Sequence, residues 1–183
     1  MSLSKKLTIW VSGIVLVGLL VLIIVSNNYT NNLLKERENA EMMLLGRTIQ
    51  SAIESELDAT KITVQMIAND PETQRLFYER NREGLLAKYD KSYSLIQEDV
   101  AQFQFHLPDS TSFLRLHDPT KFGDSLKDIR MTVNKANESG QIVSGLEKGK
   151  AGLGLRVVVP IKYNEEAIGS VEFGKGFDET FLS

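Results

Sequence analysis

The sequence predicts an α+β protein with an N-terminal transmembrane helix, a long amphipathic helix, and a five-stranded antiparallel sheet with helices packed on one face. Three observations predict this fold class. Residues 7–25 form an uncharged apolar run. Apolar residues then keep helical spacing from about residue 30 to residue 100. Near residue 102 the apolar period changes to two, and five short segments with strand character follow.

The composition narrows the possible functions. The chain has 183 residues, enough for one domain plus an anchor. Its formal net charge is −3 and no cluster of Lys and Arg follows the first six residues, which argues against nucleic-acid binding. Cysteine is absent, which excludes disulfides, thiol catalysis and thiolate metal sites. We expect no cofactor.

The apolar run over residues 7–25 predicts a membrane anchor. Its nineteen residues span about 28 Å as a helix, close to the roughly 30 Å hydrocarbon core of a bilayer. Lys5 and Lys6 precede the run, so the positive-inside rule places residues 1–6 in the cytoplasm and everything after the run outside. The run is longer than a signal-peptide core and no small-residue cleavage site follows it, which favours an uncleaved anchor. We therefore expect an inner-membrane protein with one visible span, whose C-terminal part is periplasmic or extracellular.

Residues 26–101 should hold a long helix followed by two short helices. The long helix, about 30–69, carries a mostly apolar stripe with steps of four and three residues: Ile49, Ile53, Leu57, Thr60, Val64 and Ile67. This near-heptad spacing fits packing on the helix's own domain and also pairing with a second copy. Both interpretations can hold together, so we expect a homodimer formed through residues 33–67.

The two short helices, about 71–80 and 83–100, have a clear start signal. Asp70 suits an N-cap, Pro71 suits the first helical position, and Glu72 suits the positive end of the helix dipole.

Residues 102–177 should form the sheet domain. The expected strands are separated by turn residues: 103–107, 112–116, 141–146, 154–163 and 166–174. A loop and a short helix together occupy about 120–138, between the second and third strands. Residues 178–183 would lead toward a second span.

Strand alternation assigns the candidate site to one face of this sheet. One face is almost purely apolar and should pack against the long helix. The other face carries both histidines of the chain, two arginines and a carboxylate, and two loop cations could close over it: His106, Arg115, His117, Arg156 and Glu172, with Arg130 and Lys121.

Arginine presents a planar fork that suits two carboxylate oxygens, and histidine adds a further donor. We therefore expect a pocket for a small organic anion or amino-acid-like ligand. The alternative is structural. Arg115 or Arg156 would form a cross-strand ion pair with Glu172, and the histidines would bond backbone carbonyls.

Other chemistries fit the sequence less well. His106, His117 and Glu172 have the composition of a two-histidine, one-carboxylate metal site, but two nearby arginines would repel a cation. The glycines of residues 145–151 lack the spacing of a phosphate-binding loop. No motif places a serine beside either histidine, so we expect no catalytic residues and no enzyme activity.

Several segments of the chain resemble extracellular Cache (PAS-like) sensor domains, particularly the double-Cache type. These segments are Phe105–Asp109, Ser112–His117, Phe122–Asp124, Arg130, Gly145–Glu147, Arg156–Pro160 and Ile168–Gly174. The resemblance covers about residues 30–177. It implies binding of small organic acids, amino acids or related solutes, usually by a dimer. It also implies a place in a chemotaxis receptor, sensor histidine kinase or diguanylate cyclase.

The sequence departs from the double-Cache plan by stopping at Ser183 and by showing one sheet only. Our leading expectation is the ligand-binding sensor domain of a chemotaxis-type receptor, relaying a conformational change through its long helix. The alternatives are the sensor domain of a kinase or cyclase, a ligand-independent dimerisation and anchoring module, and a metal-dependent enzyme that uses the two histidines.

Overall fold

The computed structural model describes residues 2–149 and 152–177, and the expected lead toward a second span, 178–183, lies outside them. The chain divides into two units, residues 1–50 and 51–183. From Leu3 onward the first unit is one helix, the first part of α1 (Leu3–Ala68), which continues into the second unit. Among the described residues, α1 is the one helix long and apolar enough to cross a membrane.

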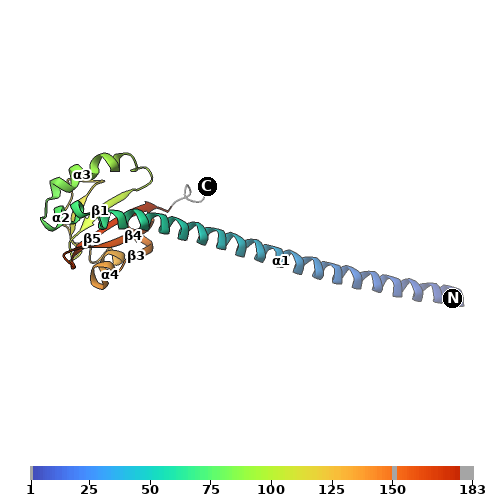
Figure 1. The fold of residues 1–183 in the computed structure, drawn as a ribbon. Coiled ribbons are helices and arrows are strands. Elements are labelled where there is room, and N and C mark those ends of the chain that lie inside the picture. The colour runs from blue at the N-terminus through green and yellow to red at the C-terminus, as the bar shows by residue number, and fades with distance from the viewer. Residues whose placement is uncertain (1, 150–151, 178–183) are drawn as a thin grey trace. The chain divides into compact units, whose positions relative to one another are not determined.

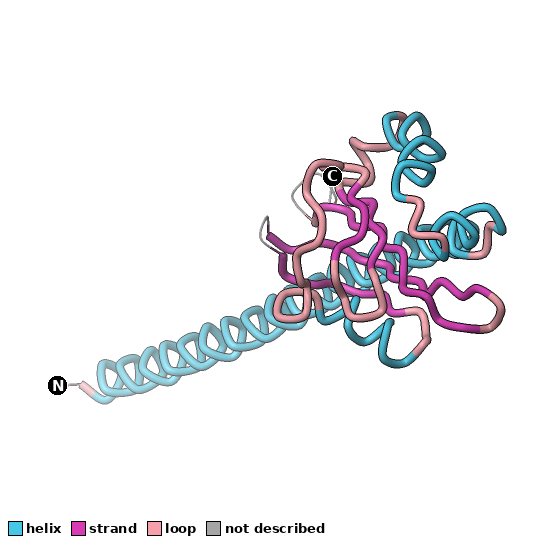
Figure 2. Tube along the Cα trace, turned by 90° about the vertical axis from the view of Figure 1, so that its left-hand side faces the viewer, coloured by secondary structure: helices cyan, strands magenta, loops and turns pink. Residues whose placement is uncertain are grey.

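The second unit begins with the last turns of α1 and contains every strand of the described chain. Its helices and strands are α2 (Pro71–Tyr78), α3 (Arg82–Ser94), β1 (Gln102–His106), β2 (Ser112–Arg115), α4 (Met131–Ser139), β3 (Val143–Gly149), β4 (Gly152–Tyr163) and β5 (Glu166–Gly176). The five strands form one antiparallel sheet in the order β2-β1-β5-β4-β3 (Figures 1 and 2). This confirms the predicted fold class.

Local capping explains where α2 and α3 begin. The Asp70 carboxylate accepts hydrogen bonds from Thr73 N at 2.7 Å and Thr73 Oγ1 at 2.8 Å. The Asn81 side chain accepts from Gly84 N at 2.8 Å and starts α3 in the same way. α3 ends at Ser94, earlier than predicted, and Val100 reaches the core from the segment that follows.

The main core lies between one face of the sheet and three helices. It contains the alternating apolar residues of the strands together with residues of α1, α2 and α3: Phe103, Phe105, Leu114, Leu116, Val157, Val159, Ile161, Val171 and Phe173, with Val64, Ala68, Leu76, Phe77, Leu85 and Tyr93. The predicted contact between the apolar face and the long helix is therefore present. Part of the predicted stripe takes part, because Leu57, Val64 and Ile67 pack on this core.

α4 lies on the opposite face of the sheet. Val133 and Ala136 of α4 pack against Val158, which alternates with the core residue Val157. This helix brings the segment before it, which carries Arg130, onto the polar face.

Two residues lie on a different face from the one that simple alternation assigns. Strict alternation from Arg115 and from Ser170 puts Phe113 and Ile168 on the polar face, but both pack on the main core. Each is the extra residue of a bulge: Phe105 pairs with Leu114 while His106 pairs with Ser112, and a similar shift follows Ile161. A bulge resets the alternation, which a period of two cannot anticipate.

Gly169 should be the most sensitive glycine of the sheet. It has φ +136°, and an added Cβ would overlap the carbonyl oxygen of His106 and lie 2.9 Å from the Phe77 ring. We expect Gly169→Ala to lower the free energy of unfolding by at least about 2 kcal/mol, measured by thermal or chemical denaturation. Gly46→Ala is the control, because no atom lies within 4 Å of its added Cβ. Equal stability of the two variants would contradict this account.

Candidate ligand-binding site

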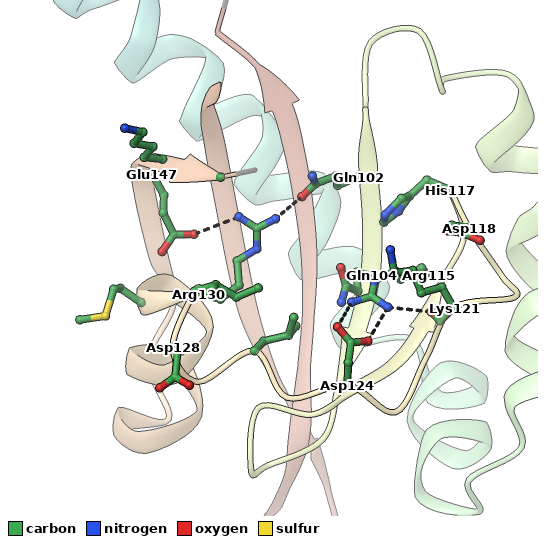
Figure 3. Close-up of a pocket in the computed structure, with 15 residues that line it drawn as sticks. Gln102, Gln104, Arg115, His117, Asp118, Lys121, Asp124, Asp128, Arg130 and Glu147 are labelled. Atoms are coloured by element: carbon green, nitrogen blue, oxygen red, sulfur yellow. Dashed lines mark hydrogen bonds and ion pairs between the residues drawn. The ribbon is translucent and has the colours of Figure 1, made fainter. Parts of the chain in front are cut away.

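A cavity of about 730 Å³ opens on the polar face of the sheet. It lies between β1, the end of β2, the loop that follows β2, the start of α4 and the end of β3 (Figure 3). Its volume is in the range of small-molecule sites. Leu126, Ile129 and Met131 supply an apolar part of the wall, and charged and polar side chains supply the rest.

The six predicted site residues fall into two groups. Arg115, His117 and Arg130 line the cavity. Arg156, Glu172 and His106 do not line it. They form a buried network within the sheet, in which each residue is at most 4 % exposed. The structure therefore brings all six to one face, but three reach the cavity directly and three support it.

Glu172 is the centre of the buried network. Its Oε2 lies 3.2 Å from Nε2 of His106, and its Oε1 accepts a hydrogen bond from Nη1 of Arg156. His106 Nδ1 in turn lies 3.3 Å from the Ser170 hydroxyl. Burial acts to raise the pKa of Glu172, but the contact with His106 and the charges of His106, Arg156 and Arg130 outweigh it. The pKa falls from 4.5 to about 2.

Glu147 connects this network to the cavity wall. Its Oε2 lies 3.2 Å from Arg156 Nε and 3.8 Å from Arg130 Nη1. The first residues of α4 hold the same carboxylate, because Thr132 N donates to Oε1 at 2.9 Å and Thr132 Oγ1 donates to Oε2 at 3.1 Å. Gln102 adds a second link, since its Oε1 accepts a hydrogen bond from Arg130 (Figure 3) and another from Arg156.

Arg130 is a buried cation of the wall with one donor that has no hydrogen-bond partner among the described residues. That donor is the buried Nη1, whereas Nη2 donates to Gln102 at 3.2 Å. Burial lowers the pKa of this guanidinium, and the charges of Arg156 and Arg115 act in the same direction. An arginine nevertheless stays charged at neutral pH. A buried cation with a free donor favours an incoming anion.

Arg115 and His117 occupy the other side of the cavity. The Arg115 guanidinium forms a two-pronged pair with Asp124, at 2.7 and 2.8 Å. Arg115 lowers the pKa of the Asp124 carboxyl by this hydrogen bonding, against the opposing effect of burial. His117 is largely exposed. Partial loss of water around its ring lowers the pKa of His117, and the charge of Arg115 adds to this effect.

Neither a metal site nor a cross-strand ion pair accounts for all of the predicted site residues. No three His, Cys, Asp or Glu side chains in the described part of the chain are placed to hold a metal ion. The ion pair of Arg156 with Glu172 is present, as the structural alternative proposed. Arg115 instead pairs with Asp124, and neither contacts Glu172.

Sequence reasoning did not name Gln102, Glu147 and Asp124 as site residues, although Asp124 and Glu147 lie in segments that resemble Cache domains. Gln102 shares the parity of Gln104 and His106 in β1, so alternation extended by one residue would have found it. Glu147 lies in β3, whose predicted end at residue 146 was too early. Asp124 lies in a loop, and no periodic signal connects a loop residue to Arg115.

An antiparallel sheet with helices against its core face and a partly cationic cavity on its other face defines a sensory module of the Cache, or PAS-like, class. The chain belongs to the double-Cache family described as the double sensory domain of two-component sensor kinases, which matches residues 35–183. No curated protein matches this chain.

Solved structures share this fold at low sequence identity. The sensor domain of Escherichia coli DcuS has 18 % identity and a TM-score of 0.57 over 68 % of this chain and 91 % of that domain. The sensor domain of the Vibrio cholerae histidine kinase DctB has 14 % identity and a TM-score of 0.58 over 74 % of this chain and 54 % of that one.

The ligand-binding domain of the Pseudomonas aeruginosa amino acid chemoreceptor PctC, in complex with GABA, has 14 % identity and a TM-score of 0.50. The match covers 76 % of this chain and 61 % of that one. The chain therefore spans little more than half of the DctB and PctC domains that it matches. At these identities the likeness establishes the fold alone.

The Glu172 network should make stability fall in acid. The folded-state pKa of Glu172 lies below its ordinary 4.5, so its contribution is complete above pH 4.5 and is lost as the pH falls toward about 2. We expect roughly 3 kcal/mol to be lost over this range at Glu172, as an upper value. Glu172→Gln should lower stability at neutral pH but flatten the acid limb of the curve. Denaturation midpoints between pH 2 and 6 measure this.

The control for Glu172→Gln is Glu138→Gln, because Glu138 is an exposed carboxylate of α4. This control should keep the full acid dependence. A Glu172→Gln curve parallel to wild type would show that the network does not hold a charged Glu172.

Proposed function

We propose that this chain is the ligand-binding module of a membrane-anchored signalling receptor and that its cavity binds a small solute carrying a carboxylate. One observation carries the proposal. The buried Nη1 of Arg130, at the wall of a 730 Å³ cavity, has no hydrogen-bond partner among the described residues. A carboxylate oxygen placed there would satisfy the donor and the charge together.

The surroundings of Arg130 support a solute with an apolar body and a charged end. His117 and Lys121 add polar groups from the loop after β2, whereas Leu126 and Met131 are apolar. The buried residues predicted as site residues, His106, Arg156 and Glu172, have a supporting role in this proposal. They fix Glu147 and Gln102, which in turn orient Arg130.

The anchor and the output follow from the family and the helix. Residues 7–25 would cross the inner membrane and the sheet domain would lie on the periplasmic or extracellular side. The last turns of α1 pack on the core face of the sheet, so a change in the sheet would reach the membrane through α1. The family description favours a sensor kinase as the parent protein over a chemotaxis receptor.

Binding should depend on the carboxylate and on Arg130. We use GABA because it is bound to PctC, together with butyrate, which lacks its amine, and butylamine, which lacks its carboxylate. In calorimetric titrations of the full chain in detergent, GABA and butyrate should bind and butylamine should not. Arg130→Gln should weaken butyrate by at least about tenfold, because a charged hydrogen bond is lost.

Two further variants control this experiment. Arg75→Gln removes an exposed arginine of α2 that pairs with Glu79 and does not line the cavity, and it should leave affinity unchanged. Arg130→Lys keeps the charge but loses the fork, so its affinity should be intermediate. If none of the three solutes binds, the result would instead favour a ligand-independent dimerisation and anchoring module.

The proposal includes a homodimer formed through the long helix. Leu57, Val64 and Ile67 are engaged in the core of the same chain, which leaves the earlier part of the helix for a partner. There, Met42 and Leu45 are 68 % and 54 % exposed and continue the stripe toward Ile49. Sedimentation of the full chain in detergent should give a dimer, weakened at least about tenfold by Leu45→Lys but not by Glu41→Lys. A strict monomer at high concentration would contradict it.

A further inference from the structure

Arg115 and Asp124 form an ion pair in the cavity wall whose two side chains differ in exposure. Arg115 is part of the wall, because its side chain is only 9 % exposed, whereas the side chain of Asp124 is 45 % exposed. Two donors of the guanidinium meet two oxygens of the carboxylate, at 2.7 and 2.8 Å (Figure 3). This is the geometry with which arginine recognises a free carboxylate.

The backbone delivers Asp124 to this position. Gly123 N donates to Ser112 O at 2.7 Å and Ser112 N donates to Asp124 O at 2.9 Å, so the loop lies along β2 as a further short strand would. Arg115 Nη1 also donates to the carbonyl oxygen of Lys121 at 2.8 Å. The guanidinium is thus held by the loop, and its two-pronged face is filled by an acid from the same chain.

We propose that Asp124 is the specificity-determining residue of the cavity: it occupies the fork of Arg115, and a solute reaches this fork only by bringing a second carboxylate, beyond the one at Arg130, that replaces Asp124. The inference rests on the proposed function and deepens it. The second carboxylate restores both hydrogen bonds of the buried guanidinium. An amine or an apolar group would leave donors of a buried cation unpaired, which is costly.

The two partners differ in how easily they can leave. The Asp124 side chain lies on the solvent side and can turn into water, where a carboxylate is fully hydrated. Arg115 cannot follow it, because the guanidinium is buried in the wall. When a carboxylate of the solute replaces Asp124, the loop is released and Arg115 stays in the cavity wall. The cavity therefore selects a solute with a planar carboxylate.

Asp128 provides a matched control in the same cavity. It also lines the wall, and it forms no ion pair within the described part of the chain. Asp128→Asn therefore removes the same formal charge as Asp124→Asn without emptying the fork of Arg115. A general electrostatic gain for anions would appear in both variants. A gain from removing a competitor would appear only in Asp124→Asn.

The experiment is a calorimetric titration of the full chain in detergent with glutarate, which is butyrate with a second carboxylate at its far end, at constant ionic strength set by chloride. Asp124→Asn should bind glutarate at least about threefold more tightly than wild type, a modest factor because the replaced carboxylate is half exposed. Asp128→Asn should stay closer to wild type than to Asp124→Asn. Equal affinities of Asp124→Asn and wild type, or equal gains in the two variants, would overturn the inference.

A second readout follows the loop directly. Amide hydrogen exchange of Gly123 and Leu126, whose N–H groups are bonded to β2 and its turn, should be faster with glutarate than with chloride in wild type. In Asp124→Asn it should already be fast and should not respond further. Slower exchange with glutarate in wild type would also overturn the inference.

The two proposals fail in different ways. If butyrate binds wild type and Arg130→Gln abolishes binding, the proposed function stands whatever Asp124→Asn does. If affinity and exchange are then unchanged in Asp124→Asn, only the role of Asp124 is lost. If no variant binds butyrate, both proposals are overturned together.

Discussion

A carboxylate with no exposure to water organises the polar face of this sheet. Glu172 on β5 has lost its hydration, so it is stable as an anion only because His106 on β1 and Arg156 on β4 compensate it. Three neighbouring strands are connected by this one group. A change in the register of any of them would leave a charge buried and unpaired. The network therefore limits which arrangements the sheet can adopt.

The cavity wall depends on the same network through the contact of Arg156 with Glu147. Arg156 holds Glu147, Glu147 is fixed by the first residues of α4, and Arg130 lies beside both. Glycines make this crowding possible, because a Cβ at Gly149 would lie 2.9 Å from Arg130 Nη1 and one at Gly174 would lie 3.0 Å from Arg156 Nη1. The Arg130 side of the wall is thus held by internal contacts and still offers one donor without a hydrogen-bond partner among the described residues. Side chains that are already held in place lower the entropy cost of binding.

The two faces of the sheet have separate tasks. The core face is apolar and receives the last turns of α1, and the other face carries the cavity. Strand β1 contributes to both faces. Its Phe103 and Phe105 lie in the core, whereas its Gln102 and Gln104 line the cavity. The core and the cavity are therefore separated by the thickness of a single sheet. In the signalling role that we propose, the domain needs two arrangements that differ little, and replacement of Asp124 by a ligand carboxylate is one way to obtain them.

The sequence by itself determined the fold class, the order of the strands along the chain and the polar character of one sheet face, because these depend on local period and turn chemistry. It also brought Arg115, His117 and Arg130 forward as candidates, and all three line the cavity. Only the tertiary structure shows which charged partner each arginine has within the chain. Arg156 pairs with Glu172 and Arg115 pairs with Asp124, whereas Arg130 lies 3.8 Å from Glu147 and its Nη1 has no hydrogen-bond partner among the described residues. Pairing depends on register, bulges and loop paths, and none of these is encoded in a residue's own neighbours along the chain.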